Sequence, residues 1–204
     1  MNDLVPMTST GAERTRYGEI PKYAEGLYDL GHQLYGWLVP NGSWGESNAG
    51  LIVGAGGQSL LVDTLWDVKY TRSMLDAMQP LLESDPLTYV VNTHADGDHF
   101  WGNQLVAGVE IITSKASDDE LSQVRPKSMI MLGRLGRLLS TMRLMGADKV
   151  GHWFQAMVKP YDFQAVIHTP ATRTFTGELT LDVGGREVRL IEVGPAHTRG
   201  DLLV

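Results

Sequence analysis

The chain has 204 residues, of which 43% are hydrophobic and 20% are charged, as in a globular protein with one large domain or two small ones. Its net charge of −7 argues against a nucleic-acid surface, which needs a basic face, but leaves room for a local basic patch. There is no cysteine, which excludes disulfides, thiolate zinc sites and cysteine nucleophiles. Signal-peptide cores and apolar runs of membrane-spanning length are absent too, so we expect a cytoplasmic protein without a membrane or nucleic-acid partner.

The first half of the chain alternates between strand and helix patterns. Residues 1–25 are polar and aperiodic, and we expect an N-terminal arm before a single domain over 26–204. Residues 26–40 are strand-rich, 41–48 form a loop, and 49–64 form a strand hairpin around a glycine-rich turn. Next come a helix over 66–82, a strand over 87–91, a helix from about 100 and a strand over 109–114. This alternation is typical of an α/β fold.

Residues 115–160 have a different pattern and predict a helical insertion. A short helix over 115–124 stops before Pro126. A second helix carries an apolar stripe, while its arginines lie off that stripe and its glycines weaken it by about 1 kcal/mol each. The stripe consists of Met131, Leu135, Leu138, Met142 and Met145. After Pro160 a hairpin is expected over 179–183 and 186–193, and a further strand begins at the DLLV that ends the sequence.

The stretch NTHADGDHFWGN, residues 92–103, follows the apolar strand 87–91 and places four potential metal ligands close together: His94, Asp96, Asp98 and His99. Neutral imidazoles and carboxylates suit Zn²⁺, Mn²⁺ and Fe²⁺, which lower the pKa of a bound water to about 7 and so favour hydrolysis. An Asp- and Gly-rich turn with exposed imidazoles is the alternative. A further histidine, His197, follows another strand and favours the metal site.

The motifs T-H-A-D-G-D-H and G-P-A-H-T-R-G-D resemble those of the metallo-β-lactamase-fold hydrolases, whose signature is H-x-H-x-D-H followed by a distant histidine. LLVDT (60–64) and SNAGLIV (47–53) resemble that family's early strands, and the resemblance runs from about residue 35 to 204. It implies an αββα sandwich, of which this chain would hold the first half plus the start of the second, with the helical insertion near 115–160.

The resemblance also implies roles for the candidate residues. His94, Asp96 and His197 would form a first metal site, while Asp98 and His99 would contribute to a second. Asp98 would in addition orient the nucleophilic water and handle its proton. Asp63 would fix the ligand loop, unless it is a plain strand-end cap. The expected cofactor is a divalent metal, Zn²⁺ first, with one or two ions.

The sequence departs from the family pattern at two points. Asp96 stands where the signature has its middle histidine, which adds negative charge, favours Mn²⁺ or Fe²⁺ more than an all-histidine set would, and argues against ordinary β-lactamase activity. The family's bridging Asp and last His have no counterpart before Val204. We therefore expect a truncated gene or an incomplete fragment, with weak stability, self-association or dependence on a missing segment. Asp201 is interpreted as structural rather than as a ligand.

These patterns favour a metal-dependent hydrolase acting on a small-molecule ester, lactone, thioester or related substrate, or a cyclase of the same superfamily. The alternatives are a non-catalytic, truncated metal-binding fragment and an iron oxidoreductase of a related fold. A homo-oligomer is compatible with each. The insertion is expected to form a substrate lid or wall that includes Trp153 and Phe154, to pack on the body or a second subunit, or to lie on a membrane surface. Trp44 is a candidate substrate contact, and Phe100 and Trp101 are expected beneath the ligand loop.

Overall fold

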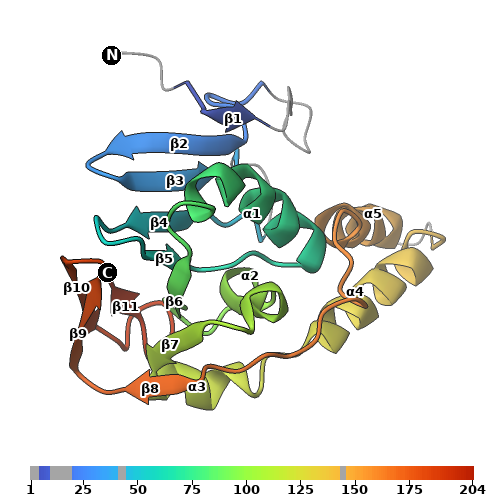
Figure 1. Ribbon diagram of the computed structural model, residues 1–204. Coiled ribbons are helices and arrows are strands. Elements are labelled where there is room, and N and C mark those ends of the chain that lie inside the picture. Colours follow the sequence, from blue (N-terminus) through green and yellow to red (C-terminus); the bar gives the residue numbers. More distant parts are fainter. Residues whose placement is uncertain (1–4, 10–19, 41–44, 143–145) are drawn as a thin grey trace.

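The computed structural model describes residues 5–9, 20–40, 45–142 and 146–204 (Figure 1). Within them the chain forms an eight-stranded sheet in the order β1 to β8 and a three-stranded sheet in the order β11-β10-β9. Strands β1 to β5 pair antiparallel, whereas β5 to β8 pair parallel. Parallel pairs need long crossovers, and here helical segments supply them. Trp44 and Met145 lie outside the described residues.

The strands confirm most of the sequence prediction. The predicted strand-rich segment and hairpin are β2 and β3 and then β4 and β5, and β6 and β7 follow where expected. Two strands are additional: β1 pairs with β2, and β8 pairs with β7. The bounds in the eight-stranded sheet are Thr8–Ser9 (β1), Gly26–Gly31 (β2), Leu34–Leu38 (β3), Ala49–Val53 (β4), Ser59–Val62 (β5), Leu87–Val91 (β6), Glu110–Ser114 (β7) and Arg173–Phe175 (β8).

The three-stranded sheet consists of β9 (Glu178–Val183), β10 (Arg186–Glu192) and β11 (Leu202–Leu203). The predicted hairpin is confirmed, and its turn residues Gly184 and Gly185 have φ angles of 57° and 83°, which favour glycine. The strand expected at DLLV is β11, which pairs antiparallel with β10.

The large sheet is buried on both faces. On one face, Leu61 and Val90 belong to the same apolar cluster as Met74 and Met78 of helix α1 (Val68–Leu82), which Figure 1 shows lying across the sheet. On the other face, neighbouring residues such as Leu60 and Val91 pack against the three-stranded sheet. Successive side chains of a strand point to opposite faces, so a strand buried on both faces is apolar throughout. The layers are helix, sheet and sheet, which confirms an α/β fold and agrees with three layers of the expected αββα sandwich.

The insertion contains three helices: α3 (Lys115–Leu121), α4 (Pro126–Leu139) and α5 (Ala147–Val158). Pro126 separates α3 from α4 and is itself the first residue of α4. A backbone N–H at this position has no partner within the helix, so proline costs no hydrogen bond there. The predicted apolar stripe does not face the core, because Met131, Leu135 and Leu138 are 67%, 46% and 61% exposed. The core contacts come instead from the other side of α4, at Ile130, Met129 and Leu132.

Helix α5 packs against the side of α4 where glycines let the two backbones come close. A Cβ atom on Gly151 of α5 would lie 2.2 Å from the backbone nitrogen of Ser140 and 2.6 Å from the carbonyl oxygen of Gly136. The α4 and α5 backbones therefore approach too closely for any side chain at this crossing. Gln155 also donates to Ser140 Oγ at 2.9 Å. The α4 glycines that weaken an isolated helix thus allow the hairpin to close.

Candidate metal centre

The ligand loop begins at the carboxyl end of β6, between the ends of β5 and β7, where α/β folds commonly place their sites. The predicted helix near 100 is broken into α2 (Gly97–Phe100) and a 3₁₀ turn, η1 (Asn103–Val106). Asn103 Nδ2 donates to Asn92 Oδ1 at 2.8 Å, and Asn92 Nδ2 donates to the carbonyl oxygen of His99 at 3.0 Å. Both asparagines are buried. They hold the two ends of the loop together.

Sequence reasoning missed this asparagine pair, although the two residues are the first asparagine and the last of NTHADGDHFWGN. Thr64 also belongs to the network, since its backbone nitrogen donates to the carbonyl oxygen of His99 at 3.0 Å. Phe100 and Trp101 are 1% and 3% exposed, which confirms that they pack beneath the loop.

His94, Asp96 and His197 meet although 101 residues separate Asp96 from His197. His197 Nε2 lies 2.7 Å from Asp96 Oδ2, and His94 Nε2 lies 3.8 Å from the same oxygen. One ligand atom from each residue lies within 4.8 Å of the other two. Two imidazoles and one carboxylate with an exposed side match the three-ligand set of a catalytic divalent site with an open position.

Asp98 and His99 lie beside this group. The His99 ring centroid is 4.0 Å from that of His94, and Asp98 Oδ2 is 3.6 Å from His99 Nε2. Burial raises the pKa of the Asp98 carboxyl above its ordinary value. Ser47 Oγ donates to the carbonyl oxygen of Asp98 at 2.5 Å, so the described end of the 41–48 loop borders the site.

Asp63, at the end of β5, controls the protonation pattern of both loop histidines. Its Oδ2 accepts hydrogen bonds from Thr93 Oγ1 at 2.7 Å and from His99 Nδ1 at 2.8 Å. Because the Thr93 hydroxyl proton points to Asp63, the Thr93 oxygen must accept from His94 Nδ1, 2.8 Å away. Both Nδ1 atoms are then protonated, which leaves Nε2 of His94 and of His99 free to bind a metal.

Burial and neighbouring charges set the pKa values of the two histidines apart. Burial and the neighbouring His99 charge lower the pKa of His94, which favours the neutral form that a metal ligand needs. Burial lowers the pKa of His99 as well, but its hydrogen bond and charge interaction with Asp63 outweigh burial and leave that pKa above the ordinary value. Asp63 is 4% exposed, so this carboxylate is well placed to orient rings rather than to meet substrate.

We expect Asp63→Asn to weaken metal binding by about 10- to 100-fold, because Thr93 N, Thr93 Oγ1 and His99 Nδ1 all donate to the two carboxylate oxygens, and an amide replaces one of those acceptors with an NH2 donor. Titration with Zn²⁺ against a competing chelator measures this affinity. Thr93→Val should remove only the His94 branch and give a smaller loss, and Thr93→Ser should retain wild-type affinity. Equal affinity in the wild type and Asp63→Asn would show that Asp63 is a plain strand-end cap.

The loop that carries His197 is held by Asp201, which supports its interpretation as a structural residue. Its carboxylate accepts from the backbone nitrogens of Thr198 at 2.9 Å and Ala196 at 3.1 Å, and from Thr198 Oγ1 at 3.1 Å. Burial raises the pKa of Asp201, but these hydrogen bonds outweigh it and leave the pKa below its ordinary value. The carbonyl oxygen of Gly200 accepts from two serines at the start of α3, which anchors the loop to the body.

The residue that follows the helical insertion contacts the loop that borders this centre. Trp153 and Phe154 contact each other, with ring centroids 5.2 Å apart, and Trp153 is 49% exposed. Tyr161, just after the insertion, donates to the carbonyl oxygen of Gly45 at 3.2 Å. This hydrogen bond joins the end of the insertion to the 41–48 loop, which borders the site.

Comparison with known proteins agrees with the geometry. The family model described as the Metallo-beta-lactamase superfamily matches residues 42–204, and the chain belongs to this superfamily, a largely hydrolytic group whose members typically bind divalent metals. No curated protein matches the sequence. Within the described residues, no helix has both the length and the apolar character needed to cross a membrane.

Solved structures show the same fold at low identity. A metallo-beta-lactamase from Pontibacter korlensis is 15% identical with a TM-score of 0.53, over 86% of this chain and 64% of that one. The DIM-1 metallo-beta-lactamase is 14% identical with a TM-score of 0.55, over 86% and 62%. The stereoselective inverting sec-alkylsulfatase Pisa1 from Pseudomonas sp. is 19% identical with a TM-score of 0.54, over 88% and 29%. The chain therefore spans less than two thirds of the length of these proteins.

Proposed function

We propose that this chain is a metal-dependent hydrolase that acts on a small-molecule ester, lactone, thioester or related substrate. The observation that carries the proposal is the meeting of two distant loops, where ligand atoms of His94, Asp96 and His197 lie within 4.8 Å of one another. Membership of the superfamily supports metal-dependent hydrolysis as the reaction class. The substrate class is inferred from the chemistry that such a site performs most directly.

His94, Asp96 and His197 would hold the ion, through Nε2 of His94, the Asp96 carboxylate and the His197 imidazole. When bound, a divalent ion acts as a Lewis acid that lowers the pKa of a water to about 7 and polarises a carbonyl oxygen. Asp98 would accept the proton of the attacking water on its carboxylate and then deliver it to the leaving group. Asp63 would hold the Nδ1 proton of both loop histidines, directly at His99 and through Thr93 at His94, so that Nε2 is the atom each offers to a metal.

We propose Zn²⁺ as the resident ion, bound as one or two ions per chain with Asp98 and His99 as ligands of a second. Asp96 makes the first site more negative than a set of three histidines, and a carboxylate also suits Mn²⁺ and Fe²⁺. Replacing Asp96→His should therefore raise the preference for Zn²⁺ over Mn²⁺. Competition between the two metals for the wild type and for this variant measures that preference.

The test combines metal content with turnover. Purified protein is analysed for bound metals, stripped with a chelator and reloaded with Zn²⁺, Mn²⁺ or Fe²⁺. Each form is then assayed on an aryl ester, a lactone and a thioester. Turnover that disappears on stripping, returns on reloading and is lost in Asp98→Asn supports the hydrolase. Metal binding without turnover on all three substrate classes would favour a non-catalytic metal-binding protein instead, and redox-active optical bands with iron would favour an oxidoreductase.

A further inference from the structure

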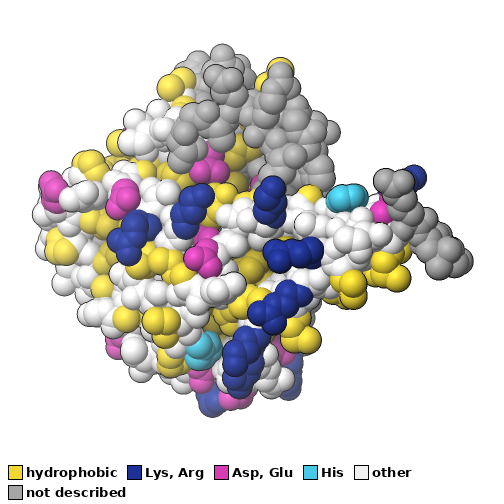
Figure 2. Space-filling model, turned by 90° about the vertical axis from the view of Figure 1, so that its right-hand side faces the viewer, with side chains coloured by type: hydrophobic (Ala, Val, Ile, Leu, Met, Phe, Trp, Pro, Cys, Tyr) yellow, Lys and Arg dark blue, Asp and Glu magenta, His cyan; other side chains and the backbone are white. Residues whose placement is uncertain are grey.

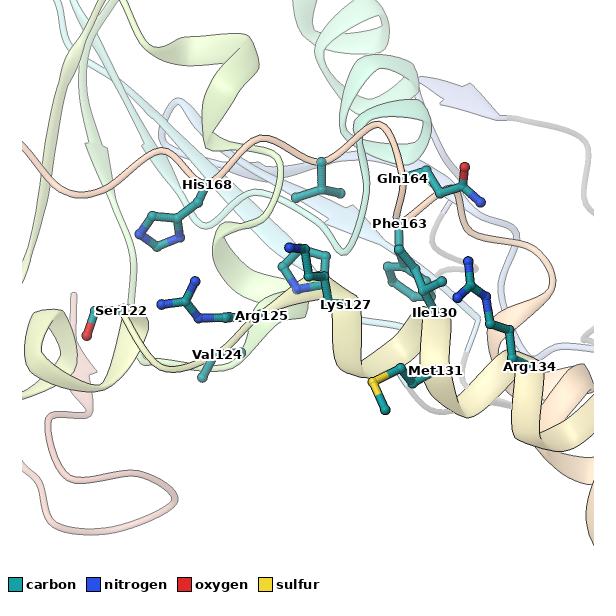
Figure 3. Close-up of a pocket in the computed structure, with 12 residues that line it drawn as sticks. Ser122, Val124, Arg125, Lys127, Ile130, Met131, Arg134, Phe163, Gln164 and His168 are labelled. Carbon is teal, nitrogen blue, oxygen red and sulfur yellow. The ribbon is translucent and has the colours of Figure 1, made fainter.

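A cavity of about 720 Å³ lies between the start of α4 and the segment 163–168 (Figure 3). Arg125, Lys127 and Arg134 line it from the α4 side, and Phe163 and His168 face them from the other side. None of the candidate metal ligands is a lining residue. The volume falls in the range of about 300–1,000 Å³ that is typical of small-molecule sites.

The charges around this cavity are all of one sign. It contains three cationic side chains and no Asp or Glu. Among the residues that the structure describes, Arg125, Lys127 and Arg134 form no ion pair with an acidic side chain. Unpaired like charges around a concave surface repel one another and attract anions. A bound anion would relieve this repulsion.

The surrounding sequence is unusual for this acidic protein. Residues 125–159 contain seven Lys and Arg and a single acidic residue, Asp148, in a chain whose net charge is −7. Figure 2 shows a column of Lys and Arg side chains on one face of the molecule, with hydrophobic side chains beside them. The insertion thus carries a local excess of basic residues, as the net charge permits.

The floor of the cavity is apolar. Ile130, Phe163 and Val166 line it and also belong to the apolar cluster beneath the ligand loop, and Phe163 is 5% exposed. A second cavity of about 470 Å³ adjoins the first, since Ile130, Arg134, Phe163 and Gln164 line both. Together they form a groove along α4 that can take an extended chain. Inorganic anions would leave this apolar surface uncovered.

The geometry points to a binding site for a monomeric amphipathic anion, an acyl chain with a carboxylate head group, with the chain on Ile130, Phe163 and Val166 and the head group among the Lys and Arg side chains that line the cavity. Guanidinium and ammonium groups bind carboxylates through charge-assisted hydrogen bonds. The concave shape favours a single molecule over the flat surface of a bilayer. This inference is independent of the proposed hydrolase, because none of the candidate metal ligands lines the groove.

The test is calorimetric titration of the full chain with sodium dodecanoate below its micelle concentration. A chelator is present, so that no metal ion can bind the carboxylate. Dodecanol, with the chain but no charge, and acetate, with the charge but no chain, should both bind at least about tenfold more weakly than dodecanoate. The double variant Lys127→Glu with Arg134→Glu should weaken dodecanoate binding by at least about tenfold and leave dodecanol binding unchanged.

Lys149→Glu is the matched control, since Lys149 lies in the same insertion and lines neither cavity. It should bind dodecanoate as the wild type does, and thermal melting should confirm that all variants are folded. Equal binding of dodecanoate and dodecanol, or an equal loss in Lys149→Glu, would overturn the proposal. So would binding to phosphatidylglycerol vesicles without any binding of monomeric dodecanoate, which would assign the face to a membrane surface.

Discussion

His94→Ala should abolish stoichiometric metal binding and lower turnover by about 10³-fold or more. His94 is half-buried, and its Nε2 lies 3.8 Å from Asp96 Oδ2, so its loss leaves one carboxylate and the exposed His197 to hold the ion. Divalent ions supply several kcal/mol of transition-state stabilisation in hydrolysis, which corresponds to this loss of rate. Metal analysis after dialysis and initial rates on the best substrate of the three classes measure the two effects.

The control for this experiment is His152→Ala. His152 is an exposed residue of α5, and the structure places it outside the group of candidate ligands. Its replacement should change neither metal content nor turnover. If His94→Ala keeps one tightly bound ion per chain and a rate within about twofold of wild type, the assignment of the first metal site is wrong, whatever the substrate proves to be.

Gly151→Ala should destabilise the fold by about 2–3 kcal/mol, although alanine favours an isolated helix by about 1 kcal/mol over glycine. The added Cβ would lie 2.2 Å from Ser140 N and 2.6 Å from Gly136 O, which are backbone atoms that cannot rotate away. The α4–α5 crossing must open to accept the methyl group. Urea unfolding of wild type and variant, followed by circular dichroism, measures the difference in free energy of unfolding.

Gly133→Ala is the comparison within the same helix pair. Its Cβ would meet only Val158 Cγ2, a side-chain atom 3.1 Å away that can shift. The helix-propensity gain then offsets the small steric cost, and the free energy of unfolding should stay within about 1 kcal/mol of wild type. If Gly151→Ala were as stable as Gly133→Ala, the two helices would not cross as closely as the structure has them.

The ligand loop and the hairpins could be predicted because their signals are local. Period-two alternation and the Gly184-Gly185 turn define the β9–β10 hairpin within a few residues of chain. The spacing of His94, Asp96, Asp98 and His99 is likewise visible in one short stretch. His197 could be assigned to the same site because its local motif, G-P-A-H-T-R-G-D, resembles that of the family's distant histidine.

The packing of the helical insertion could not be predicted from the sequence. Spacing placed Met131, Leu135 and Leu138 on one face of a helix, but spacing cannot say which face meets a neighbour. That choice depends on α5, whose Gly151 admits the backbone of α4 at a particular crossing. Glycines that lower helix propensity became the packing surface, because close approach of two backbones outweighs the propensity of either helix alone.

By itself the sequence determined the α/β order, the two histidine-bearing motifs and the excess of basic residues over 125–159, since each depends on neighbours along the chain. Only the tertiary structure decided which helix face stays exposed, how Arg125, Lys127 and Arg134 come to surround one cavity, and how Asp63 reaches His94 through Thr93. Those features join segments that are distant in sequence. Their geometry depends on sheet register and helix crossing, which no local pattern encodes.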